Sequence, residues 1–215
     1  MGECNDIAGL LKDKWGDRTP RPPAKEKASA VLIPLIKTEN GWEILFERRA
    51  LTLDVQPGDI CLPGGGVEDG ESHREAAIRE ACEELLITSS SIDIIAPMDG
   101  VFGPGERIIW PFLGVLRDYR GTFSRDEVDS VFTMPVKWFF ENEPSRHITW
   151  MENHPKEDFP YELIYGGRNY KFRKRPFEML FFENGRDTIW GATARVINAF
   201  LQLCRESFNG PGPFD

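Results

Sequence analysis

The sequence predicts an α+β fold in which a mixed β-sheet packs between helices. Short apolar runs rich in β-branched residues recur through the chain and are typical of strands. Two stretches, one at 72–86 and one at the C-terminal end, have the apolar spacing of amphipathic helices. Strands and helices do not alternate in a βαβ rhythm, so a purely parallel α/β sheet is not expected.

A length of 215 residues suits one domain with appendages. Residues 1–28 are expected to form a short amphipathic helix, Asp6 to Trp15, followed by a linker rich in proline and charge. The main domain is predicted to span 29–206. Residues 207–215 are expected to form a flexible C-terminal tail.

Composition excludes several classes of protein. The formal net charge of -9 opposes nucleic acid binding, because the phosphate backbone is negatively charged. No apolar run of eighteen residues and no secretory leader is evident, so no membrane association is expected. The four cysteines lie far apart, which argues against a zinc site or a disulfide framework. Reduced thiols indicate a cytoplasmic protein.

The first strands are predicted at 30–38 and 42–49, joined by a hairpin turn at 39–41. A glycine-rich loop with one short strand near 60–62 precedes the helix at 72–86. Further strands are expected at 92–97, 108–117, 161–165, around Phe172 and at 178–182. Residues 131–141 are predicted to run from a strand into a short helix, and Thr188 is the expected cap of the last helix.

The helix at 72–86 carries the chemical signal. Ser72 and Glu75 have the spacing of a capping box at its start. Glu80 and Glu84 are four residues apart and lie one above the other, with Glu83 beside them. Like charges at this spacing destabilise a helix by a few tenths of a kcal/mol. Hard dications prefer oxygen ligands and offset that repulsion.

Acidic residues on a helix are more often a solvated surface than a metal site. The glycines at 64–66 favour the second interpretation, because a glycine-rich loop before a helix lets the backbone approach a ligand closely. Such a loop alone is weak evidence. Loop and helix at a fixed spacing are much stronger evidence together.

From Gly65 the chain reads glycine, five residues, Glu71, seven residues, then Arg79-Glu80-Ala81-Cys82-Glu83-Glu84-Leu85-Leu86-Ile87. This pattern resembles the Nudix box, the signature of a family of metal-dependent hydrolases. The resemblance implies a Nudix-like α/β/α sandwich around the mixed sheet. Leu86 stands where the family usually has glycine, so a different exit from the helix is expected.

The resemblance also implies a role for each matching residue. Glu80 and Glu84 are expected to bind Mg²⁺ or Mn²⁺, with Glu83 as a further ligand or a base acting through water. The carbonyl of Gly65 is expected to face a metal ion. Glu71 and Arg79 are expected to form a structural ion pair that fixes the loop on the helix.

Further acids follow the predicted helix at 126, 127 and 129. Among them Glu127 is chosen as the candidate distal base or outer ligand, although a solvated acidic loop is the competing interpretation. Metal ions neutralise a pyrophosphate and lower the pKa of a bound water, so no Ser, Cys or His nucleophile is needed. The three histidines are therefore expected to be bystanders.

The segment 45–65 is similar to the one that marks the coenzyme A diphosphatase branch of the family, and 189–194 also resembles that branch. Arg49 is the first candidate for a phosphate contact and Arg48 the second, with the backbone of Gly64 and Gly65 alongside. Asp54 departs from the branch pattern, because it replaces a positive residue with a negative one.

The resemblance thus predicts a diphosphatase that cleaves coenzyme A or acyl-coenzyme A into adenosine 3′,5′-bisphosphate and (acyl-)phosphopantetheine. Two alternatives stay open: a hydrolase of ADP-ribose or a nucleoside diphosphate sugar, and a Nudix-like sensor that binds a nucleotide without cleaving it. The expected partner is a small nucleotide, and a homodimer is expected by analogy. The basic run 171–175 either draws an anionic substrate or is a solvated hairpin.

Overall fold

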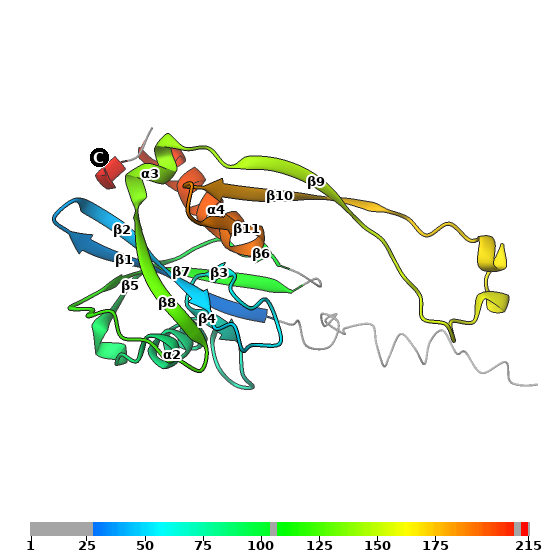
Figure 1. Ribbon diagram of the computed structural model, residues 1–215, viewed down its shortest axis with the longest axis horizontal. Coiled ribbons are helices and arrows are strands. Elements are labelled where there is room, and N and C mark those ends of the chain that lie inside the picture. Colours follow the sequence, from blue (N-terminus) through cyan, green and yellow to red (C-terminus); the bar gives the residue numbers. More distant parts are fainter. Residues whose placement is uncertain (1–27, 104–106, 209–211, 215) are drawn as a thin grey trace, which may run out of the picture.

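The computed structural model describes residues 28–103, 107–208 and 212–214 (Figure 1). The predicted N-terminal helix and all but the last residue of the predicted linker lie outside these residues. The division into a domain at 29–206 and flanking segments stays a prediction. Within the described part, α4 continues to Phe208, two residues past the predicted end of the domain.

The strands of the main sheet are β1 (Ala28–Thr38), β2 (Gly41–Arg49), β3 (Ile60–Cys61), β4 (Gly64–Gly66), β5 (Ile92–Pro97), β6 (Val101–Phe102), β7 (Ile108–Leu116) and β8 (Val128–Pro135). The helices are α2 (His73–Leu85), α3 (Val136–Glu141) and α4 (Gly191–Phe208). A second sheet contains β9 (Ser145–Met151), β10 (Arg175–Glu183) and β11 (Thr188–Trp190).

The main sheet is mixed, as the sequence predicts. Strands β1 and β7 pair in parallel, whereas the other paired strands run antiparallel. Helix α2 covers one face of this sheet, and α3, α4 and the second sheet cover the other (Figure 1). The predicted α/β/α sandwich is therefore confirmed.

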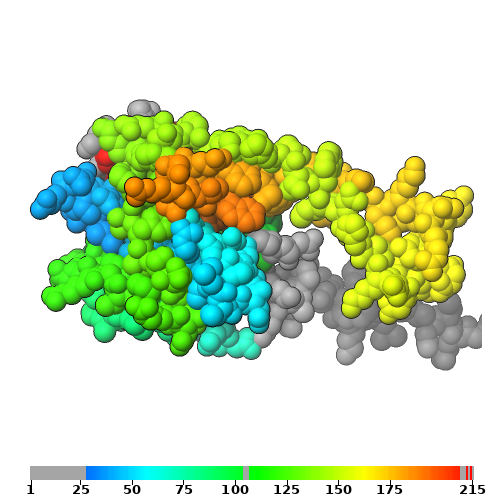
Figure 2. Space-filling view, in the orientation of Figure 1, coloured from blue at the N-terminus to red at the C-terminus, as the bar shows by residue number. Residues whose placement is uncertain are grey.

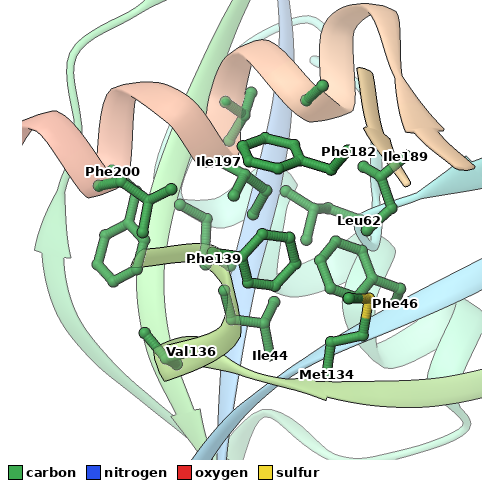
Figure 3. Packing of buried hydrophobic residues seen from close by; sticks show 14 of the residues in the cluster. Ile44, Phe46, Leu62, Met134, Val136, Phe139, Phe182, Ile189, Ile197 and Phe200 are labelled. Atoms are coloured by element: carbon green, nitrogen blue, oxygen red, sulfur yellow. The ribbon is translucent and has the colours of Figure 1, made fainter. Parts of the chain in front are cut away.

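Each face of the sheet has its own apolar core. On the α4 side, aromatic residues pack edge to face, with the rings of Phe139 and Phe182 5.2 Å apart (Figure 3). On the α2 side, Leu32 and Leu45 pack against Ala81 and Leu85 of the helix. The small alanine lets α2 approach the strands closely, which places its acidic edge beside the glycine strand β4.

Local hydrogen bonds set both ends of helix α2. The Ser72 hydroxyl accepts a hydrogen bond from the Glu75 amide, and the Glu75 carboxylate accepts one from the Ser72 amide, as predicted. The sequence predicted that leucine at position 86, in place of glycine, would change how the helix ends, and this prediction is wrong. Leu86 adopts the left-handed conformation, with φ 53° and ψ 47°, and the Ile87 amide donates to Cys82 O as in a Schellman motif. Backbone hydrogen bonding at the helix end therefore holds leucine in the conformation that glycine would adopt.

We expect Leu86→Gly to increase the free energy of unfolding by about 1 kcal/mol, because a left-handed leucine is strained and its side chain is 60% exposed. Urea denaturation measures this change. Leu86→Ala is the matched control: it removes most of the side chain but keeps the Cβ atom, so no gain is expected. Equal effects of the two substitutions would contradict the role assigned to strain.

Strands β9 and β10 form a hairpin whose far end, with the connecting segment 152–174, projects from the body of the protein as an arm; the connecting segment is drawn in yellow in Figure 2. Strand β9 was not predicted, because its seven residues are all exposed and lack the pattern of a half-buried strand. The predicted strand at 161–165 is wrong: Tyr161–Leu163 form a 3-10 turn followed by Gly166 and Gly167 with positive φ. Phe172 lies outside regular structure and packs on Phe159 and Tyr170.

The start of the last helix also differs from expectation. Thr188 was predicted to cap it, but this residue pairs with Glu183 in the hairpin of β10 and β11. The helix begins at Gly191, whose φ of +63° lets the chain turn sharply out of the strand. The threonine therefore satisfies its backbone groups in a sheet, which the local sequence did not reveal.

In the part of the chain that the structure describes, helices are too short or too polar to cross a lipid bilayer. The cytoplasmic location and the homodimer stay predictions.

Candidate active site

The glycine strand β4 and the acidic edge of α2 meet at close range. The Gly64 amide donates a 2.7 Å hydrogen bond to Oε2 of Glu84. The Glu80 carboxylate lies over Gly65 so closely that a Cβ atom there would be 2.4 Å from its Cδ atom. Both glutamates are mostly buried, with Glu84 5% exposed. Absence of a side chain at Gly65 is thus what admits the Glu80 carboxylate.

Arg79 fastens this loop to the helix. Its Nε and Nη2 atoms donate to the two carboxylate oxygens of Glu71 at 2.9 and 3.1 Å, and Nη2 also donates to Gly66 O. The hydrogen bond from Arg79 holds the pKa of Glu71 below its usual range. The arginine therefore joins loop, helix and strand β4, as the resemblance implies.

The same guanidinium also contacts two of the predicted ligands. Nη1 donates to Oε1 of Glu80 at 2.9 Å and to Oε2 of Glu83 at 3.2 Å. The Glu83 side chain is 59% exposed, so it lies at the rim of the site. Among the described residues, no three acidic, His or Cys side chains are already gathered as a metal cage. Binding of an ion would therefore draw Glu80, and Glu83 if it takes part, from Arg79 toward Glu84.

Glu127 lies close enough to act on the other carboxylates. Its charge raises the pKa of both Glu80 and Glu84, although burial is the larger cause for each. The chain holds it in place through its backbone, because Glu127 O accepts a hydrogen bond from the Ala50 amide. Asp126 and Asp129 are not among the main causes that shift the pKa of these carboxylates.

Arg49 is a second cation near the carboxylates, besides Arg79. Its charge lowers the pKa of Glu84 and of Glu47, opposing the effects of burial and of the neighbouring carboxylates. A β-bulge between Arg48 and Arg49 re-aims the side chain at the end of β2. The Arg49 Nε atom donates to Val55 O in the following loop. Arg49 thus contacts the following loop and lies close enough to the carboxylates for its charge to act on them.

Arg48 lies elsewhere. It donates to Oδ1 of Asp187 at 2.5 Å and to Gly58 O at 3.2 Å. With Arg186 and Trp190 it lines a separate hollow of about 360 Å³, and Glu80, Glu84 and Glu127 are not among the residues that line this hollow. The structure therefore brings Arg49, but not Arg48, to the carboxylates. Of the histidines, His73 stacks on Trp110 with ring centroids 4.9 Å apart.

Sequence reasoning missed one acidic residue of this cluster. Glu47 is fully buried near the C-terminal end of β2, and it shares a face of the strand with Leu45, which packs on Ala81 and Leu85 of α2. Burial first, then the charge of Glu84, raises its pKa well above the usual value. The available signal was an acid in an otherwise apolar strand, Ile44-Leu45-Phe46-Glu47, at a position facing the helix.

The donor set fits a divalent cation. Four carboxylates come from three parts of the chain: Glu47, Glu80, Glu84 and Glu127. Burial raises the pKa of the first three, the charge of Glu127 adds to that effect, and the charge of Arg49 opposes it at Glu47 and Glu84. One buried oxygen, Oε1 of Glu47, has no hydrogen-bond partner. Carboxylate oxygens are the ligands that Mg²⁺ and Mn²⁺ prefer. Both carboxylate oxygens of Glu80 lie over Gly65; Arg79 donates to Oε1, so Oε2 is the oxygen more readily available to an ion.

Stability of the metal-free protein should fall as pH rises, because burial, with Glu80 and Glu127 adding, raises the pKa of Glu84 to about 8. In the unfolded chain this group titrates near 4.5. The folded state therefore holds a proton that the unfolded state releases between these values, and stability present below pH 4.5 is lost as pH approaches 8. The contribution is on the order of a few kcal/mol.

Urea denaturation in chelator across this pH range, for the wild type and Glu84→Gln, measures that contribution. The difference between the two proteins should change with pH, since the amide does not titrate. Parallel curves for the two proteins would show that Glu84 keeps an ordinary pKa.

The NUDIX domain family model matches residues 26–154, which include both β4 and α2. The chain belongs to the Nudix family. Nudix hydrolase 3 of Caenorhabditis elegans is 32% identical over 114 residues, covering 51% of this chain and 48% of the relative. Nudix hydrolase 15, mitochondrial, of Arabidopsis thaliana is 29% identical over 205 residues, covering 92% of this chain and 63% of the relative.

A third relative, the uncharacterized Nudix hydrolase NudL of Shigella flexneri serotype 5b, is 35% identical over 121 residues, covering 54% of this chain and 61% of the relative. The chain thus spans between about half and two-thirds of the length of these curated relatives. A MutT/nudix family protein from Enterococcus faecalis has the same fold, with a TM-score of 0.51 at 16% identity; the match covers 95% of this chain and 72% of that one.

Proposed function

We propose that this Nudix protein hydrolyses a pyrophosphate bond in a nucleotide derivative with the help of Mg²⁺ or Mn²⁺. The observation that carries the proposal is the approach of Glu80 and Glu84 to the glycine strand, where the Gly64 amide bonds Glu84 and the Glu80 carboxylate lies over Gly65. A dication held there would neutralise the phosphates and lower the pKa of a water molecule.

Residues of this chain would fix the loop, orient the phosphates and accept a proton. Arg79 and Glu71 keep the loop fixed on the helix while substrate binds. Arg49 orients the phosphates through its guanidinium group, which can form paired hydrogen bonds with an anion. Glu127, at the edge of the carboxylate cluster, is the candidate to accept a proton from the attacking water.

The substrate class we propose is coenzyme A or acyl-coenzyme A, cleaved to adenosine 3′,5′-bisphosphate and (acyl-)phosphopantetheine. The resemblance of 45–65 and 189–194 to the coenzyme A diphosphatase branch supports it. One observation favours a second candidate, hydrolysis of ADP-ribose or a nucleoside diphosphate sugar: Asp54 places a negative charge on the exposed loop that follows Arg49.

Turnover of a substrate panel by the purified chain tests the proposal. Coenzyme A, acetyl-coenzyme A, ADP-ribose and a nucleoside diphosphate sugar are each incubated with Mg²⁺ or Mn²⁺, and with chelator as the control. Cleavage of the coenzyme A compounds supports the first substrate class, and cleavage of ADP-ribose or the sugar nucleotide alone supports the second. Tight binding without any cleavage would reject hydrolysis in favour of a sensor.

We expect Arg49→Ala to raise KM by about tenfold or more with a smaller effect on kcat, because a charged hydrogen bond to phosphate is lost. Arg48→Ala is the comparison. Its main expected effect is on the free energy of unfolding, since Arg48 is bound to Asp187 and Gly58. Steady-state kinetics and urea denaturation of both variants measure these effects. The reverse result, a raised KM only in Arg48→Ala, would place the phosphate contact in the hollow that Arg48 lines.

A further inference from the structure

Glu47 has features that neither core packing nor the described hydrogen bonds explain. Its side chain is fully buried, yet its Oε1 atom has no hydrogen-bond partner. Burial of a carboxyl oxygen without a partner costs free energy, and an apolar residue of similar size would avoid that cost. Such a group in a native protein calls for an explanation.

The surroundings of Glu47 indicate what would satisfy it. It lies on the face of β2 that packs on α2, and the charges of Glu84, Glu127 and Arg49 act on its carboxyl group. The Sγ atom of Cys61, a weak donor, is 4.0 Å from Oε2. Carboxyl groups that lie near one another in a buried site repel when they are ionised.

A divalent cation resolves both problems, because it binds carboxylate oxygens and cancels their mutual repulsion. We propose that Glu47 is a further oxygen ligand of the metal site and shares the ion with Glu84, an inference that rests on the metal centre of the proposed function. Glu47 lies on β2, the strand beneath the helix, whereas Glu80 and Glu84 lie on α2. The ion would therefore be held between two elements of the fold.

Binding of Mn²⁺ alone, measured by isothermal titration calorimetry without substrate, tests this inference. We expect Glu47→Gln to weaken Mn²⁺ binding by about tenfold or more. Glutamine has nearly the same shape but no charge, so a residue that only fills its place in the strand would leave the affinity unchanged. Glu43→Gln is the matched control on the same strand: Glu43 hydrogen-bonds Thr38 and Thr133 at the other end of β2, and no change in affinity is expected.

Thermal denaturation in chelator checks that each variant folds. If Glu47→Gln does not fold, Glu47→Asp is the second variant: it keeps the charge but withdraws the carboxylate by one methylene group, and the same loss of affinity is expected. Wild-type affinity in a folded Glu47 variant overturns the inference and leaves the proposed function standing. Absence of Mn²⁺ binding by the wild-type protein overturns both.

Discussion

Glu84→Gln should lower kcat by two to three orders of magnitude or more while the protein stays folded. A loss of kcat of this size is typical when one preorganised electrostatic contact to a transition state is removed. Glu84 is 5% exposed and the charges of Glu80, Glu127 and Arg49 act on it, so loss of its charge removes a proposed metal ligand that water cannot replace. The amide oxygen can still accept the hydrogen bond from Gly64, which keeps the loop in place.

Kinetics with saturating metal, together with thermal denaturation in chelator, separate the two effects. The melting temperature of metal-free Glu84→Gln should equal or exceed that of the wild type at pH 8, because the buried negative charge is gone. A folded Glu84→Gln protein with normal turnover would remove Glu84 from the ligand set.

Gly64→Ala should destabilise the protein by about 3 kcal/mol or more, near the upper end of single substitutions. Gly64 has a φ of +154°, and a Cβ atom there would lie 2.4 Å from Ala30 O and 2.6 Å from the Cα atom of Val31. These atoms belong to the backbone of the paired strand β1 and cannot move aside without disrupting the sheet. Displacement of the loop would also break the bond from its amide to Glu84.

Gly66→Ala is the matched control in the same strand. No atom lies within 4 Å of a Cβ atom built at Gly66, and its φ is not positive, so we expect a change within about 0.5 kcal/mol. Urea denaturation of both variants measures the difference. Comparable losses at the two positions would contradict the close approach of β4 to β1.

Helix α2 was predictable from the sequence because the signals for it are local. The capping box at Ser72 and Glu75 and the spacing of Glu80 and Glu84 depend only on helix geometry. The exposed arm was not predictable, since strand β9 buries none of its residues and its pairing with β10 is not encoded in hydrophobic period. Thr188 failed as a cap for a related reason: pairing with Glu183 decided its structure.

The candidate site likewise contains some residues that local sequence predicts and others that depend on the tertiary fold. Residues inside the motif follow from their spacing along the chain, whereas Glu47, Arg49 and Glu127 depend on how strands and loops fold against the helix. Glu127 follows from the order of elements, because the loop before β8 returns beside β2. Glu47 needed knowledge of which face of β2 meets Glu84, and only the packing of the sheet on α2 supplies it.

A crystal grown with Mn²⁺ and measured near the manganese absorption edge tests the metal centre most directly. The account predicts an anomalous peak within coordination distance, about 2.1–2.3 Å, of carboxylate oxygens of Glu80 and Glu84 and beside Gly65. A peak bound elsewhere, or well-ordered glutamates pointing into solvent with no ion between them, would contradict it.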